Sequence, residues 1–261
     1  MSAQAIDLKD PKAAPAGRDR RPGLARLTKV ELRKMVDTRS GFWLMAAVVG
    51  LTLVAVLITA LVGHEDDRTC HRILSNGLAP AGILLPVVGI LLVSSEWSQR
   101  TSLVSFALVP GRARLIGAKV LAGIVLALAA TVVALVFSVF ATAIASTNAP
   151  DHWSLPLGLL LQDIVYVVTA MVIGIGFGAA LLASAPAIVL YFAVPIALAA
   201  LGSIHAIAGV IEWINVGEST APLSERLLSG HEWGQVLVSL VLWMVVPLAI
   251  GLWRITRGDI G

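Results

Sequence analysis

Two glycine-rich strings in this sequence have part of the spacing of nucleotide-binding motifs. A P-loop requires Gly-x4-Gly-Lys-Ser/Thr, and the nearest string, Gly111–Val120, has the wrong spacing and no hydroxyl after Lys119. Gly174–Ala179 matches the letters of a dinucleotide fingerprint, but it lies in an apolar run, where a pyrophosphate would lie in hydrocarbon. The Gly-x3-Gly spacing of Gly174 and Gly178 predicts instead a helix face that a second helix approaches closely. We therefore expect no cofactor on this chain.

Residues of metal-ligand type gather between two apolar runs: His64, Asp66, Asp67, Cys70 and His71. No matching pair of ligands recurs elsewhere, so a solvated loop explains the cluster as well as a metal site does, and we predict no metal. The single cysteine excludes a disulfide within the chain. A disulfide between two copies through Cys70 remains open.

Three polar residues lie within apolar runs: Gln162, Asp163 and His205. An intramembrane carboxylate is costly to bury and is therefore a functional candidate. Asp163 could serve transport, or it could lie near enough to the membrane surface to reach water. No Ser-His-Asp or Glu-Glu-x3-Arg pattern for an intramembrane hydrolase stands out, and we predict no catalytic residue.

The composition indicates an integral membrane protein rather than a soluble enzyme. Of 261 residues, 57% are hydrophobic and 13% are charged, against about 25% charged in soluble domains. A membrane span requires roughly 20 apolar residues, and the mean hydropathy is +0.89. We predict an all-α polytopic fold with about six transmembrane helices near 42–62, 78–95, 120–145, 157–183, 186–211 and 235–253. The long apolar stretch from 157 to 211 must fold back, and Ser184-Ala185-Pro186 is the predicted break.

The distribution of Lys and Arg predicts that both termini are cytoplasmic. Ten lie in the first 41 residues, four in the loop 96–119 and two in the tail, whereas the opposite side has only Arg68, Arg72 and Arg226. The net charge of +3 therefore reflects topology, and we expect no nucleic-acid partner.

The N-terminal arm has two parts. Residues 1–22, rich in Ala, Pro and charge, are predicted to be a disordered cytoplasmic arm. Residues 23–41 are predicted to form an amphipathic helix on the inner membrane surface, with a solvated basic linker as the alternative. Its apolar side comprises Leu24, Leu27, Val30, Leu32, Met35 and Val36.

The cytoplasmic loop 96–119 resembles the loop after the second span in membrane subunits of type-2 ATP-binding-cassette (ABC) transporters. That family pattern is an acidic residue, a Thr, an apolar run, Pro-x-Arg and a Lys that opens the third span. The matching residues here are Glu96, Thr101, Pro110, Arg112 and Lys119. The resemblance implies an ATPase-coupling loop, which also includes Gln99, Arg100, Phe106 and Arg114.

The arm and one outer segment resemble the same family. The stretch with Glu31, Arg33, Lys34 and Arg39 resembles the connecting helix, and 212–232 fits the partly embedded outer helices. We expect Glu96 to pair with Arg33 or Lys34 of the arm. By resemblance, spans two and five line the substrate path, which suggests Tyr191, Phe192 and Pro195 as path residues. Asp163, in the predicted fourth span, is a further candidate for the path because it is an intramembrane carboxylate.

The resemblance implies a permease subunit of a bacterial two-gene exporter in the plasma membrane. The chain lacks a nucleotide-binding domain, so ATP and Mg²⁺ would bind two copies of a separate ABC ATPase. A second copy of the chain, or a related permease, would complete the transporter. Export of a drug, lipid or peptide is the expected activity. The alternatives are a membrane-embedded enzyme or processing factor, which requires convergent polar residues, and a secondary transporter, which should show internal repeats.

Overall fold

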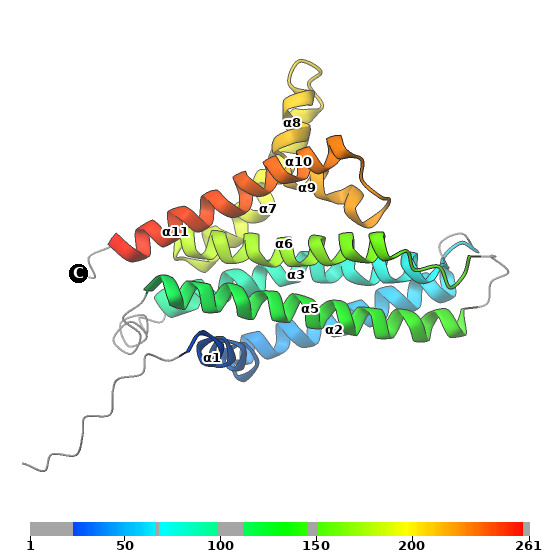
Figure 1. Ribbon diagram of the computed structural model, residues 1–261, viewed down its shortest axis with the longest axis horizontal. Coiled ribbons are helices and arrows are strands. Elements are labelled where there is room, and N and C mark those ends of the chain that lie inside the picture. Colours follow the sequence, from blue (N-terminus) through cyan, green and yellow to red (C-terminus); the bar gives the residue numbers. More distant parts are fainter. Residues whose placement is uncertain (1–22, 66–67, 99–111, 146–150, 258–261) are drawn as a thin grey trace, which may run out of the picture.

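The computed structural model describes residues 23–65, 68–98, 112–145 and 151–257, and these form helices and turns, with no strand among them (Figure 1). The predicted arm 1–22 lies outside these residues. The elements are α1 Leu24–Asp37, α2 Arg39–Val62, α3 Cys70–Ser98, α5 Arg112–Ile144, α6 Leu157–Leu181, α7 Ser184–Gly202, α8 Ala208–Ile214, α9 Val216–Thr220, the 3-10 helix η2 Ala221–Ser224, α10 Gly230–Leu240, the π-helix η3 Val241–Val245 and α11 Val246–Arg257.

Six helices in the described part are long and apolar enough to cross a membrane, as the sequence predicts. They are α2, α3, α5, α6, α7 and the continuous run of α10, η3 and α11. The long apolar stretch does break between spans four and five, at Leu182 and Ala183, directly before the predicted Ser184-Ala185-Pro186. Leu182 has a positive φ of 56°, which ends α6, and α7 begins at Ser184. Pro186 then lies in the first turn of α7, where its missing N–H is tolerated.

Several helices have other bounds than the apolar spans that the sequence predicts. α3 begins at Cys70 rather than near 78, and α5 begins at Arg112 rather than near 120. Hydropathy marks only the apolar part of a helix, whereas its backbone hydrogen bonds continue through polar turns. The fifth span ends at Gly202 rather than 211, because tight turns follow in which Ile204 and Ile207 donate to carbonyls three residues earlier. The sixth spans Gly230–Arg257 rather than 235–253.

The centre of the bundle is the contact between α3 and α6. About two-thirds of each span is buried, 67% for α3 and 61% for α6, against 6% for α7. A Cβ on Gly178 would lie 2.7 Å from the carbonyl oxygen of Ile90, and one on Gly89 would lie 2.8 Å from that of Met171. Gly174 lies similarly against Pro86, so the predicted close approach at the Gly-x3-Gly face is confirmed.

Figure 1 shows α2, α3, α5 and α6 lying side by side, while α7 and α8 lead away from them. One end of the bundle holds α1, the last turn of α3, the start of α5 and the end of α11, and we call it the α1 end. The other, the far end, holds the starts of α3 and α6 and the end of α5. The axis of α1 crosses those of α2 and α5, against which it packs.

Candidate functional site

Four charged side chains from three helices meet at the α1 end. Lys119 of α5 donates to Glu31 of α1 at 2.7 Å and to Glu96 of α3 at 3.0 Å. Lys34 of α1 donates to the same two carboxylates, each at 2.9 Å. We call these four residues the charge cluster.

The cluster is neutral as a whole and is closed to solvent on one side. Lys119 is 1% exposed and Glu31 is 2% exposed. The third proton of the Lys119 ammonium goes to the carbonyl oxygen of Leu92 at 3.0 Å, so all three donors of this buried cation have partners. Two cations and two anions thus compensate one another, which burial of charge requires.

Lys34 lies on the exposed rim of the cluster, with 44% of its side chain accessible. Partial burial lowers its pKa, but the hydrogen bonds and charges of Glu31 and Glu96 outweigh that effect, and the net shift of its pKa is upward. Lys34 therefore stays charged at physiological pH.

The sequence of α1 explains how Glu31 becomes buried. Leu27, Glu31 and Met35 recur every four residues and form the buried stripe of the helix. The predicted apolar side is therefore only partly right. Leu24, Val30 and Val36 are exposed in the isolated chain, and a glutamate takes the central buried position.

The expected pairing of Glu96 with the arm is confirmed for Lys34 and not for Arg33, which pairs with Asp37 on the surface at 3.1 Å. Arg39 and Arg114 are exposed. Arg112 is the first residue of α5. The remaining predicted coupling-loop residues, Gln99, Arg100, Thr101, Phe106 and Pro110, lie outside the described residues.

The sequence reasoning did not predict the pairing of Glu31 with Lys119. The signal was a single carboxylate at the centre of an apolar stripe and a single ammonium directly before an apolar run. Those two isolated charges each required a partner, but nothing in the sequence identified it.

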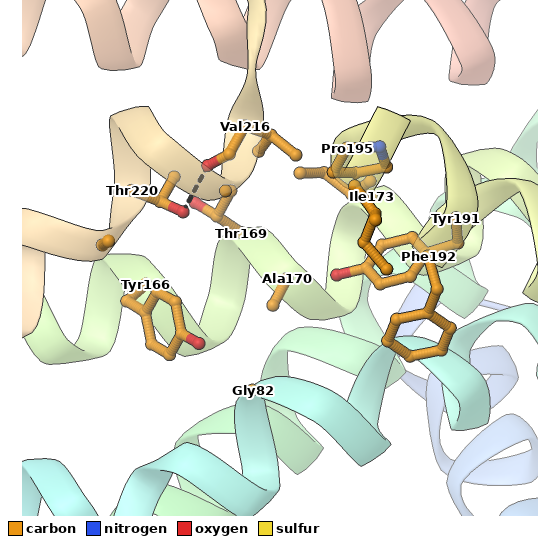
Figure 2. A pocket seen from close by; sticks show the side chains of 13 residues that line it. Gly82, Tyr166, Thr169, Ala170, Ile173, Tyr191, Phe192, Pro195, Val216 and Thr220 are labelled. Carbon is orange, nitrogen blue, oxygen red and sulfur yellow. Dashed lines mark hydrogen bonds between the residues drawn. The ribbon is translucent and has the colours of Figure 1, made fainter. Parts of the chain in front are cut away.

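A pocket of about 260 Å³ lies between α3, α6, α7 and α9 (Figure 2). Three of the four residues predicted for the substrate path, Tyr191, Phe192 and Pro195, line it. The fourth, Asp163, does not. The lining residues that the prediction missed include Gly82, Tyr166, Thr169, Ile173, Val216 and Thr220.

The pocket is apolar, with hydroxyl groups as its main polar side-chain atoms. Figure 2 shows Tyr166 near Gly82 and the ring of Phe192 beside Tyr191. The hydroxyl of Thr220 already donates to the carbonyl of Val216 at 2.6 Å. None of the described residues that line the pocket carries a formal charge. Such a pocket can bind an uncharged apolar group by contact and desolvation.

The three polar residues of the apolar runs lie apart from one another. Gln162 donates to the carbonyls of Leu223 and Arg226 and accepts from the N–H of Leu228. Asp163 is buried against His71. His205 is exposed. Among the described residues, no group of three or more His, Cys, Asp or Glu side chains is placed to hold a metal ion.

The chain matches no protein-family model and no curated protein sequence.

Proposed function

We propose that this chain is the membrane subunit of a type-2 ABC transporter and exports a small molecule with ATP hydrolysed by a separate subunit. The observation that carries the proposal is the charge cluster. Its members come from α1, from the last turn of α3 and from the start of α5, which are the helices on both sides of the predicted coupling loop and the predicted connecting helix.

The proposed orientation places both termini in the cytoplasm. The strong excess of Lys and Arg in the arm, the loop 96–119 and the tail supports this orientation. In that arrangement α1 is an interfacial helix on the cytoplasmic surface, and its exposed apolar residues Val30 and Val36 would face lipid. The far end of the bundle then faces outward. The membrane would be the plasma membrane of a bacterium.

The charge cluster would transmit movement of the loop 96–119 to the helices that line the pocket. A force on the loop acts on the ends of α3 and α5, and the buried ion pairs oblige α1 to move with them. Gly82 in the pocket wall lies fourteen residues from Glu96 on α3, about 21 Å along the helix. Movement of α3 relative to α7 would change the pocket, which is how ATP-driven closure could alternate access.

The polar residues give little support to the alternative of a membrane-embedded enzyme. Such an enzyme requires side chains that converge on one point, whereas Gln162, Asp163 and His205 have separate surroundings. The pocket, in contrast, is compatible with binding and release of an apolar molecule.

The first experiment is purification of the tagged chain from its native membrane in mild detergent, with identification of what accompanies it. A stoichiometric soluble protein with a P-loop, together with ATPase activity in the pooled complex, would support the proposal. A chain that purifies without a nucleotide-binding partner, even after cross-linking, would refute it.

The second experiment tests the role of the cluster in coupling. Glu96→Ala should lower the substrate-stimulated ATPase activity of the complex while the partner remains bound. Glu65→Ala is the matched control, because Glu65 is exposed near the far end. Unchanged stimulation in Glu96→Ala would show that the cluster does not transmit the signal.

A further inference from the structure

His71 and Asp163 form a buried pair at the far end of the bundle. His71 lies in the first turn of α3 and Asp163 in the second turn of α6, and Nε2 of the imidazole is 3.3 Å from Oδ2 of the carboxylate. His71 is 5% exposed and Asp163 is fully buried. Nε2 and both carboxylate oxygens lack any hydrogen bond of good geometry. These are unusual groups, because nearly all buried polar atoms have hydrogen-bond partners.

Neighbouring polar groups are already committed to other partners. The side-chain amide of Gln162, the residue before Asp163, forms hydrogen bonds with the backbone of the segment 223–228. The ring nitrogens of His152 contact the carbonyls of Arg68 and Thr142, at 2.9 and 2.7 Å. The imidazole of His71 is therefore the group available to neutralise the Asp163 carboxylate.

The other titratable groups of the elements packed against α3 and α6 lie mainly at the α1 end. Lys119 of α5 is nineteen residues from Ser138, so about 28 Å separates it from the far-end part of α5. Glu96 is twenty-five residues from His71, about 38 Å along α3. Near the far end, the titratable and charged groups on or beside these elements are His64, Glu65, Arg68, Cys70, Arg72, Asp151, His152, Tyr166, Glu225 and Arg226. Tyr191 lies on α7, and Arg39, Arg112, Arg114, Arg254 and Arg257 lie on the remaining parts of α2, α5 and α11.

The net charge that each protonation state would bury decides which state the packed structure favours. Without a proton, the pair is a neutral imidazole beside a bare carboxylate, and burial strongly disfavours a carboxylate without hydrogen-bond donors. With one proton, it is either an imidazolium–carboxylate pair or a neutral hydrogen-bonded pair. Both protonated forms remove the uncompensated charge.

We propose that His71 and Asp163 form a proton-binding site in which one proton, shared between Nε2 and the carboxylate, holds the far ends of α3 and α6 together. Release of that proton leaves a buried negative charge and loosens this end of the bundle. The site is distinct from the pocket and from the charge cluster, and its existence does not depend on the transport proposal.

The sign of the pH effect follows from the bound proton. The packed state holds the proton and the loosened state, with the carboxylate in water, gives it up more readily. The stabilisation is therefore present at low pH and is lost as the pH rises, by up to about tenfold in the opening equilibrium per pH unit when one proton is released.

Cys70 is a native reporter of this opening. It precedes His71, it is buried, and it is the single cysteine of the chain. The N–H groups of Cys70 and His71 donate to the carbonyls of His152 and Ser154, so the start of α3 is tied to the segment before α6. Separation of the two segments would expose the thiol.

The test measures the rate at which a maleimide labels Cys70 in the purified full-length protein, between pH 5.5 and 8.5, for the wild type and Asp163→Asn. The asparagine carries no charge in this range and still accepts a hydrogen bond from Nε2. The ratio of the two rates cancels the pH dependence of the thiol itself. We expect the wild-type rate, relative to that of Asp163→Asn, to rise about tenfold or more across the range.

His205→Gln is the control, because His205 is exposed, and its profile should match the wild type. If Asp163→Asn fails to fold, His71→Gln serves in its place, because it has no imidazole to carry the shared proton; the wild-type rate relative to that of His71→Gln should then also rise about tenfold or more from pH 5.5 to 8.5. A constant ratio between the wild type and a folded variant would overturn the proposal. Equal labelling rates for the wild type and both substitutions at every pH would likewise show that the pair holds no exchangeable proton.

Discussion

Replacement of Lys119 by methionine removes the central charge of the cluster while it keeps most of the side-chain volume. Glu31 loses its 2.7 Å partner, and the carbonyl oxygen of Leu92 loses its donor from the same ammonium. Lys34 still contacts both carboxylates. The cluster changes from neutral to a net charge of −1, and Glu31 remains almost fully buried.

The expected cost follows from the burial of that uncompensated charge. Removal of one partner from a buried ion pair costs about 3–5 kcal/mol. Because Lys34 continues to neutralise part of the cluster from its rim, we expect about 2–4 kcal/mol for Lys119→Met. For a chain of this size, that corresponds to a decrease in Tm of about 5–15 °C.

The assay is thermal unfolding in detergent, followed by tryptophan fluorescence and by recovery of the monodisperse peak in size-exclusion chromatography. Lys29→Met is the matched control, because Lys29 is an exposed lysine on α1, and it should shift Tm by no more than about 1–2 °C. Equal Tm values for Lys119→Met and Lys29→Met would refute the reasoning.

A double variant distinguishes the destabilisation caused by the uncompensated charge from that caused by the lost packing. Glu31→Gln combined with Lys119→Met restores neutrality, because Lys34 and Glu96 then remain as one pair. The double variant should be more stable than Lys119→Met alone by about 1–3 kcal/mol. A purely additive loss would show that the buried charges do not act on each other.

Three further predictions concern other parts of the bundle. Gly178→Ala at the contact between α3 and α6 should cost about 1–3 kcal/mol in thermal unfolding, whereas Gly50→Ala, with open space around its Cα, should be neutral or stabilising. Gln162→Ala removes three hydrogen bonds to the segment before α10 and should cost about 1–3 kcal/mol; trypsin should then cleave that segment faster, and an unchanged cleavage rate would contradict the anchoring role. Gly82→Ala places a methyl group against the ring of Tyr166 and should weaken substrate stimulation of the ATPase complex without lowering its basal rate, so equal stimulation would exclude the pocket from the substrate path.

The sequence alone determined the features that depend on whether a segment lies in the bilayer or in water. Runs of apolar residues predict the spans because the bilayer requires a fixed length of apolar helix, and the need for a break between α6 and α7 follows from the excess length of the run that contains both. The Gly-x3-Gly spacing likewise predicts the close contact of α6 with another helix, although it does not identify α3 as the partner. The sequence did not predict the turns after α7, because most of residues 203–207 are apolar although the backbone leaves the helix there.

Tertiary structure decided which polar groups meet. Glu31 and Lys119 are separated by 88 residues, and their pairing depends on α1 crossing the start of α5. His71 and Asp163 face each other only because α3 and α6 pack closely along their glycines. A sequence shows that an isolated charge in an apolar segment requires compensation, because burial without a partner is costly. Only the three-dimensional packing of helices determines which partner supplies it, since that choice depends on the relative position and rotation of helices distant in the chain.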